Sequence, residues 1–169
     1  MKKIIAILIS LLMLFCIACS ESESSSFAEG TTCEQILNAA VGVKDYDNVE
    51  QYIKGKTDLD SYTMSMWADG LFAECEEFNL LSDYAICYSK DNTTYEISVL
   101  KAKSTDDVSK IESLLERRKQ TLEGGTKAAY DPNFKKLMQN SKIETCGEYV
   151  IFILTDDNDA VKDAIEKLK

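Results

Sequence analysis

The stretch that decides the fold runs from residue 142 to residue 157 and reads KIETCGEYVIFILTDD. Its first part, 142–146, predicts a β-strand, and Gly147-Glu148 predicts a tight turn. The part that follows, 149–154, predicts a second strand that is apolar at every position. A strand of that kind is buried on both faces, so we expect it to lie at the centre of a sheet.

A helix follows this strand directly. Thr155, Asp156 and Asp157 favour the N-cap position, because their side-chain oxygens accept hydrogen bonds from free backbone N–H groups. The apolar residues after them recur at helical spacing and form one stripe: Val161, Ala164, Ile165 and Leu168. Residues 142–169 therefore predict a β-hairpin followed by a helix.

The same order occurs earlier in the chain. Alternating side chains predict one strand at 84–89 and a second at 95–99, with a turn at 90–93 between them. Ser104 and Thr105 then favour the start of a long helix, and the glycine pair at 124–125 ends it. The buried stripe of this helix is predicted to be Val108, Ile111, Leu114, Leu115 and Leu122. A short helical turn is expected after Asp131-Pro132, with Phe134, Leu137 and Met138.

Residues 83–122 and 142–169 are thus two β-hairpin–helix units. We expect an α+β fold in which they form a four-stranded, mostly antiparallel sheet packed with helices. Placing the weaker strands 84–89 and 142–146 at the edges gives the order 1-2-4-3, reached by a right-handed split crossover.

The N-terminal part of the domain is predicted to be helical. Thr31 and Thr32 pair with Glu34 and Gln35 in overlapping capping boxes, and apolar residues follow at helical spacing. A second helical piece is expected before Gly55, from the spacing of Tyr46, Val49, Tyr52 and Ile53. Between 56 and 81 the pattern fits a helix or an apolar loop. The Met, Trp and Phe side chains there favour core packing over a ligand pocket.

The first 30 residues predict that the protein is located at a membrane. Two lysines precede an apolar run of about 15 residues, which is shorter than the roughly 20 that span a bilayer as a helix, so 1–18 is predicted to be a cleaved signal peptide. Cys16-Ile17-Ala18-Cys19 resembles the lipobox of bacterial lipoproteins, although Leu is usual at the position of Cys16. We expect a lipid on Cys19, with ordinary signal-peptidase cleavage as the alternative. Residues 19–30 then form the lipidated cysteine and a flexible Ser/Glu tether, and 31–169 form a single domain.

Composition excludes several classes of partner and site. The formal net charge is −10 and the chain has no histidine. Strong acidity repels nucleic acid and anionic headgroups, and the lack of imidazole removes the commonest general base and metal ligand. Four cysteines remain in the domain without any C-x-x-C spacing, so we expect no metal site and no cofactor. They are either disulfide partners or small buried side chains: Cys33, Cys75, Cys87 and Cys146.

Part of the chain resembles a known family. The resemblance lies in three stretches: YAICYSKDNTTYEISVLKAK at 84–103, the helix with Glu116-Arg117-Arg118, and residues 147–157. Together they resemble the domain-of-unknown-function 4358 family over about 83–169. The resemblance implies a small lipoprotein of Clostridia-like Gram-positive bacteria, and it implies no assigned activity and no catalytic residues.

Three clusters of polar residues are candidate sites. The acidic run at 156–159 lacks the alternating ligands and closing Glu of a calcium loop and is better explained as a helix cap. Glu74, Glu76 and Glu77 are expected to form a solvated face, since a carboxylate pair that cleaves sugars must face across a cleft. The basic residues of the long helix are either favourable charge near its C-terminus or a candidate partner-docking site: Arg117, Arg118 and Lys119.

Two function classes follow from these observations. The first is a non-enzymatic module at the cell envelope, which its lipid holds at the membrane. It would bind a protein, peptide or wall component through a sheet edge or through the basic residues 117–119. The alternative is a small wall-directed hydrolase that uses carboxylates. The missing histidine favours the first class, and we expect no catalytic residue and no nucleic-acid partner.

Overall fold

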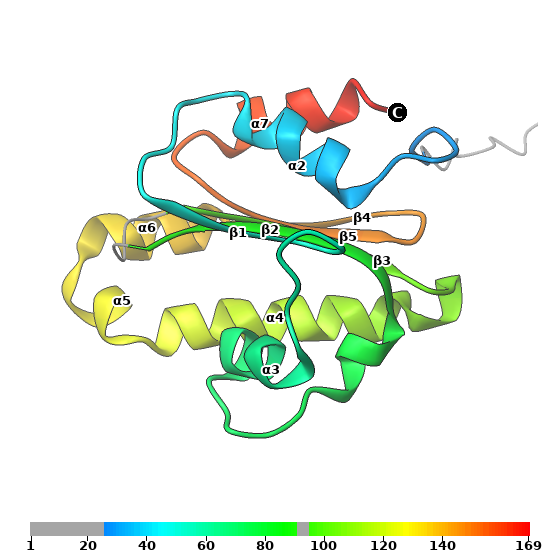
Figure 1. Ribbon diagram of the computed structural model, residues 1–169. Helices are drawn as coiled ribbons and strands as arrows, with labels where there is room; N and C mark the ends of the chain where they lie inside the picture. Colours follow the sequence, from blue (N-terminus) through cyan, green and yellow to red (C-terminus); the bar gives the residue numbers. More distant parts are fainter. Residues whose placement is uncertain (1–25, 91–94) are drawn as a thin grey trace, which may run out of the picture.

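The computed structural model describes residues 26–90 and 95–169, which form three layers (Figure 1). A β-sheet is the middle layer. The upper layer in Figure 1 consists of α2 (Cys33–Val41) and α7 (Asn158–Glu166). The lower layer consists of four helices: α3 (Ser61–Asp69), α4 (Val108–Gly124), α5 (Thr126–Tyr130) and α6 (Pro132–Asn140). The predicted α+β class is confirmed.

The sheet has five strands in the order β1-β2-β3-β5-β4, and every neighbouring pair is antiparallel. The strands are β1 (Val49–Ile53), β2 (Leu81–Ser89), β3 (Glu96–Ala102), β4 (Lys142–Cys146) and β5 (Tyr149–Leu154). Short 3₁₀ turns precede β2 and α4, at η1 (Glu76–Leu80) and η2 (Thr105–Asp107).

The strand β5 is the centre of the molecule, as its sequence predicts. All six of its residues are buried, and successive side chains point to opposite faces of the sheet. Val150, Phe152 and Leu154 join the core below the sheet, with α3, α4 and α6. Tyr149, Ile151 and Ile153 join the core above it, with α2 and α7. Two separate cores therefore pack against one strand.

The strand β1 was not predicted, because residues 46–53 have an apolar spacing that suits a helix. In the structure residues 49–53 of this segment are extended and pair with β2, from Val49 opposite Ser89 to Ile53 opposite Ala85. Tyr52 faces the lower core, where its ring stacks on Tyr88 with centroids 6.2 Å apart. The pairing with β2 overrides the local pattern, since five residues with mixed apolar spacing fit either period.

This strand also corrects the expected sheet. The sheet has five strands instead of four. The four predicted strands keep their predicted relative order, as β2-β3-β5-β4, and β1 is added outside β2. Because β1 lies outside β2, the strand predicted at 84–89 is an inner strand and not an edge. At the other side of the sheet, β4 is the edge.

The N-termini of α2, α6 and α7 follow the predicted capping residues, whereas α4 begins after Asp107 and not at Ser104 or Thr105. Thr32 caps α2 in a full capping box with Gln35, which is one of the two overlapping boxes in the sequence. Asp131 caps α6 with Pro132 in the first turn, and Asp157 caps α7. The ambiguous segment 56–81 contains α3, which buries Met64 and Trp67 in the lower core.

The turn between β4 and β5 has two residues, Gly147 and Glu148, as the sequence predicts. Gly147 has a φ of 59°, in the left-handed region. Two-residue hairpin turns need this conformation at their first position, and glycine adopts it without steric cost.

The predicted signal peptide 1–18, Cys19 and the tether up to residue 25 lie outside the described residues. Within the predicted tether, Phe27 is buried and packs edge-to-face on Tyr149 with ring centroids 5.0 Å apart. The folded part therefore includes Phe27, which lies within the stretch predicted to be a flexible tether. Among the described helices, none combines the length and apolar character needed to cross a membrane.

Candidate functional site: a cavity beside a buried ion pair

The three basic residues singled out by the sequence follow one another on α4 but have different surroundings. Arg117 Nε donates to Asp69 Oδ1 at 2.6 Å, and its Nη2 donates to Glu77 Oε1 at 2.8 Å. Arg118 is directed into the protein, and Lys119 is half-buried without an ion pair to any described residue. Docking of a partner on these residues stays a prediction, and two of the three cations already have carboxylate partners within the chain.

Arg118 forms a buried ion pair with Glu96, the first residue of β3. The guanidinium donates from Nε to Oε2 at 3.0 Å and from Nη2 to the same oxygen at 2.6 Å. Glu96 is 2% exposed, and the Ser98 hydroxyl donates to its Oε1 at 3.0 Å. A buried carboxylate is costly unless its oxygens are hydrogen-bonded, and here both oxygens have donors.

The same arginine also completes the end of α3. Its Nη1 donates to the carbonyl oxygen of Trp67 at 2.8 Å, and the Thr121 hydroxyl donates to that of Ala68, also at 2.8 Å. The last carbonyls of a helix have no partner within the helix and carry its partial negative charge. Arg118 also lies over the Trp67 ring, 5.3 Å from its centroid. Arg118 therefore joins β3, α3 and α4.

A cavity opens beside this ion pair, between the end of β2, the start of β3 and the helices α4 to α6. We call it the α4–α6 cavity. Its volume is about 470 Å³, within the range of small-molecule sites. The lining residues are Tyr88, Ser89, Lys90, Tyr95, Glu96, Arg118, Thr121, Leu122, Gly125, Thr126, Lys127, Phe134 and Leu154.

The polar part of the lining is mostly basic. Lys90, Arg118 and Lys127 line the cavity, and Glu96 is the one acidic residue among the lining residues that the structure describes. Arg118 neutralises Glu96, so the two lysines provide the remaining charge. Neither lysine has an ion pair with a described residue.

The apolar part of the lining is held by aromatic contacts. Tyr88 stacks on Tyr52, and its hydroxyl donates to Glu50 Oε2 at 3.1 Å, which fixes the ring. Phe134 is 4% exposed, and Lys127 Nζ lies 5.2 Å from its ring centroid. The lysine head group is thereby placed where the apolar wall meets the cationic one.

The hydroxyl groups of the wall are in their protonated form at neutral pH. Burial raises the pKa of Tyr95 well above its usual value, and burial with Tyr52 and Glu50 beside it raises the pKa of Tyr88. Thr121 donates its hydroxyl proton to the α3 carbonyl. A hydroxyl nucleophile needs an adjacent base, and the chain has no histidine to supply one.

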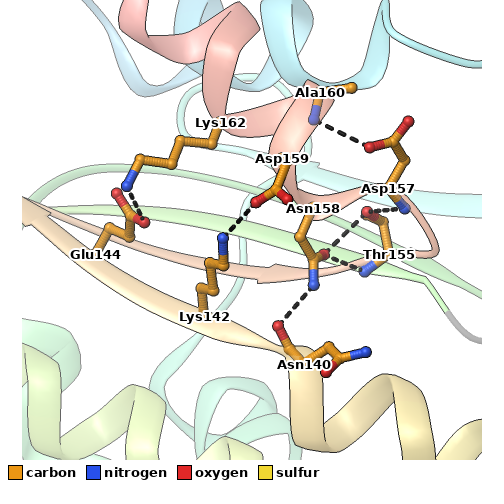
Figure 2. Close-up of polar contacts among 9 residues, drawn as sticks. All are labelled: Asn140, Lys142, Glu144, Thr155, Asp157, Asn158, Asp159, Ala160 and Lys162. Atoms are coloured by element: carbon orange, nitrogen blue, oxygen red, sulfur yellow. Dashed lines mark hydrogen bonds and ion pairs between the residues drawn. The ribbon is translucent and has the colours of Figure 1, made fainter.

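Side chains of the acidic run at 156–159 form hydrogen bonds and ion pairs within the fold (Figure 2). Asp157 accepts a hydrogen bond from the Ala160 N–H at 3.1 Å, and Asp159 pairs with Lys142 at 2.6 Å. Among the described residues, no group of three or more His, Cys, Asp or Glu side chains is placed to hold a metal ion. These contacts agree with the helix-capping interpretation of the run.

Asn158 in the same run ties α7 to the end of α6. Its amide nitrogen donates to the Asn140 carbonyl at 2.8 Å, and its oxygen accepts from the Thr155 N–H at 2.8 Å (Figure 2). Asn158 is 8% exposed, so its polar atoms are satisfied within the fold.

The four cysteines of the domain are buried, and none of them forms a disulfide with another described cysteine: Cys33, Cys75, Cys87 and Cys146. This agrees with the second of the two alternatives that the sequence left open. Burial raises the pKa of Cys33 and Cys87, and raises that of Cys75 to about 11. Thiols of this kind are protonated at neutral pH and are poor nucleophiles.

The glutamates near residue 75 do not assemble around a cavity. Glu77 accepts hydrogen bonds from Arg117 and from the Cys75 thiol, at 2.8 and 3.3 Å, while Glu74 and Glu76 are exposed. The arrangement resembles the solvated face that the sequence predicts, with one of its members used to hold α4 against η1.

Sequence reasoning missed the α4–α6 cavity, because its lining comes from segments up to 66 positions apart, from Tyr88 to Leu154. One signal was available. Glu96 is the single acidic residue within the apolar sequence of β3, EISVLKA, and a charge in a buried strand requires a partner. The partner, Arg118, was identified, but as a candidate for external docking.

Comparisons with known proteins place part of the chain in a family. The model of a family described as a domain of unknown function, DUF4358, matches residues 77–155. The match starts six residues before the predicted resemblance and ends before α7. The search of curated proteins gave no match, and the search of solved structures gave none either. Residues 77–155, which include every residue lining the α4–α6 cavity, match the model of the DUF4358 family.

Proposed function

We propose that the protein is a lipid-anchored, extracytoplasmic binding module that holds a ligand in the α4–α6 cavity and does not change it chemically. The observation that carries the proposal is the cavity itself. Its volume suits a small ligand, its wall combines cationic and aromatic groups, and it is built wholly from the DUF4358 stretch.

The chemistry of the wall favours binding over turnover. Hydrolysis near neutral pH needs a poised base, an activated nucleophile or a metal. A hydrolase with a carboxylate pair needs two such groups across the substrate, and Glu96 is the one carboxylate of the described lining. Both oxygens of Glu96 already accept hydrogen bonds, from Arg118 and from Ser98, and are engaged within the fold.

The position of the N-terminus supports an anchored orientation. The described chain enters at Phe27, which packs on Tyr149 at the start of β5, whereas Leu154 at the end of β5 lines the cavity. A six-residue strand spans about 20 Å, so the two sites lie at opposite ends of the sheet. A lipid on Cys19 would hold the end near Phe27 towards the membrane and leave the cavity accessible.

Isolation of the endogenous ligand tests this proposal. The full chain would be purified from membranes in mild detergent, and released small molecules would be identified by mass spectrometry. We expect a compound that is present with the parent protein and absent with Thr126→Trp, which places a large ring at the cavity wall. Thr145→Trp, on the exposed edge strand β4, is the matched control and should retain the compound.

The opposing outcome is catalysis. If the protein hydrolyses wall glycans or peptides, and Glu96→Gln abolishes the activity while circular dichroism stays unchanged, the binding proposal is refuted.

A further inference from the structure

The charge of the α4–α6 cavity is opposite to that of the whole chain. The chain carries a formal net charge of −10, yet three of the charged lining residues are basic and one is acidic. A local excess of positive charge within an acidic protein attracts anions to that place and is not explained by general solubility.

The two lysines are the groups that give this excess. The charge of Arg118 is matched by Glu96, which its guanidinium contacts through two nitrogens. Lys90 is exposed and Lys127 half-buried, and both are without a carboxylate partner among the described residues. An ammonium group in this position binds a carboxylate or phosphoryl oxygen through charge-assisted hydrogen bonds.

The opposite wall requires an apolar group on the same ligand. Phe134, Leu122 and Leu154 come from α6, α4 and β5, and Tyr88 adds the face of a ring held by Tyr52. Lys127 Nζ lies 5.2 Å from the centroid of Phe134, so the cationic and apolar walls meet at one place. A ligand that carries its anionic group next to an apolar group would satisfy both walls together.

We infer that the α4–α6 cavity binds a small organic anion, whose carboxylate or phosphoryl group contacts Lys127 and Lys90 and whose apolar body packs on Phe134 and Tyr88. The inference rests on the binding role proposed above and names the class of ligand. Inorganic anions lack the apolar body, and neutral compounds leave the lysines without a partner.

Trp67 provides a built-in reporter for the test. It is the only tryptophan of the chain, and the guanidinium of Arg118, a lining residue, lies 5.3 Å from its ring centroid. Charge placed near this pair by a ligand changes the field at the indole. Binding is therefore measured on the full chain in detergent by Trp67 fluorescence, excited beyond the absorption of phenyl rings, and by calorimetry.

Four probes separate the features of the ligand. N-acetylphenylalanine carries a carboxylate and a phenyl ring, and N-acetylphenylalaninamide is its neutral match. Phenyl phosphate tests the phosphoryl source, and acetate tests charge without an apolar body. We expect N-acetylphenylalanine or phenyl phosphate to bind at least about tenfold more tightly than the amide and acetate, the tighter of the two identifying the anionic group.

Lysine variants place the effect in the cavity. Lys127→Gln should weaken binding of the tighter anion by about three- to tenfold, and Lys127→Arg, which keeps the charge, should restore most of it. Lys136→Gln removes the same charge from an exposed site on α6 outside the cavity lining and should leave the affinity unchanged.

The outcomes separate the inference from the proposed function. If the amide binds as tightly as its acid, the anionic class is wrong, but the binding role stands. Equal effects of Lys127→Gln and Lys136→Gln also overturn the inference, because general charge would then explain the binding. If neither anion binds, the ligand class is wrong, and the endogenous-ligand experiment decides the binding role separately.

Discussion

At the scale of residues, the ion pair of Arg118 and Glu96 connects three elements of the fold, β3, α3 and α4. Glu96 starts β3, and Arg118 reaches it from α4 while donating to the last turn of α3. Replacement of one member leaves a buried charge without its partner, whereas replacement of both removes the charge and its desolvation cost together.

This asymmetry gives a first prediction. Arg118→Met should lower the free energy of unfolding by about 3–5 kcal/mol, because Glu96 stays buried and unpaired. The double variant Glu96→Leu with Arg118→Met should recover a large part of that loss. Urea unfolding of the two single variants and the double variant measures the coupling.

Arg117→Met is the matched control for the ion pair. Its carboxylate partners are more exposed, and its own side chain is 35% exposed, so we expect a loss of at most about 1 kcal/mol. A loss for Arg118→Met no larger than that for Arg117→Met would contradict the structural role of the buried pair.

A second prediction concerns stability at alkaline pH. Burial raises the pKa of the Cys75 thiol from 9.0 to about 11, so the unfolded chain loses this proton at lower pH than the folded chain. The contribution of Cys75 to the stability of the folded state is therefore fully present below pH 9 and is lost as the pH rises from 9 to 11. The share of Cys75 is about 1.4 kcal/mol for each pH unit in which only the unfolded thiol is ionised.

Urea titrations at several pH values test this dependence. Cys75→Ala should be less stable at pH 8 but should lose less stability between pH 9 and pH 10 than the parent protein. Identical pH dependence in the two proteins would show that the Cys75 thiol does not contribute. The buried Cys33, Cys87 and Tyr95 have raised pKa values as well, so part of the alkaline loss should persist in the variant.

At the scale of elements, β5 separates the upper core from the lower core. Among the described strands, it is the one in which every residue is buried. Phe152 and Ile153 are adjacent in sequence, yet one belongs to the lower core and the other to the upper core. Each layer of helices therefore depends on alternate residues of one six-residue strand.

The third prediction follows from this position. Phe152→Asp and Ile153→Asp should each prevent folding or cost well above about 4 kcal/mol, because each buries an unpaired carboxylate at a site no more than 1% exposed. Thr145→Lys, at an exposed position of β4 beside Glu112, should change the stability by less than about 0.5 kcal/mol. If neither aspartate variant changes the thermal midpoint of unfolding, β5 is not the central strand.

At the scale of the whole molecule, the chain has a predicted anchor at one end of the sheet and a cavity at the other. The anchor is a sequence prediction, since Cys19 lies outside the described residues. The cavity comes from the structure. The two are compatible because Phe27 joins the fold near the start of β5, away from the cavity.

The fourth prediction tests the anchor. Cys19→Ser should leave the precursor unprocessed or release the protein to the medium, and metabolic labelling with a fatty acid should disappear, because the hydroxyl does not replace the thiol as lipid acceptor. Cys16→Leu introduces the residue usual at that position and should keep both the lipid and the membrane location. Unchanged labelling and retention in Cys19→Ser would remove the anchored orientation from the proposal.

Sequence alone determined the parts of this protein that depend on local periodicity and capping. The buried strand β5, its glycine turn, the hairpin of β2 and β3, and the caps of α2, α6 and α7 follow from side-chain spacing within a few residues. Alternation and helical spacing report which face of an element is buried, and these elements bury one face or both in a simple pattern. The strand β1 was not predicted in this way, because its five residues fit both the helical spacing and the alternation of a strand.

Only the tertiary structure decided β1 and its place outside β2, the partners of Arg117 and Arg118, and the α4–α6 cavity. Each depends on which distant segments meet: β1 on pairing with β2, Arg118 on Glu96 22 positions away, and the cavity on residues from Tyr88 to Leu154. A sequence shows that a buried charge needs a partner and that basic side chains are available. The three-dimensional packing decides that Arg118 is used inside the fold and that Lys90 and Lys127 are left facing a cavity.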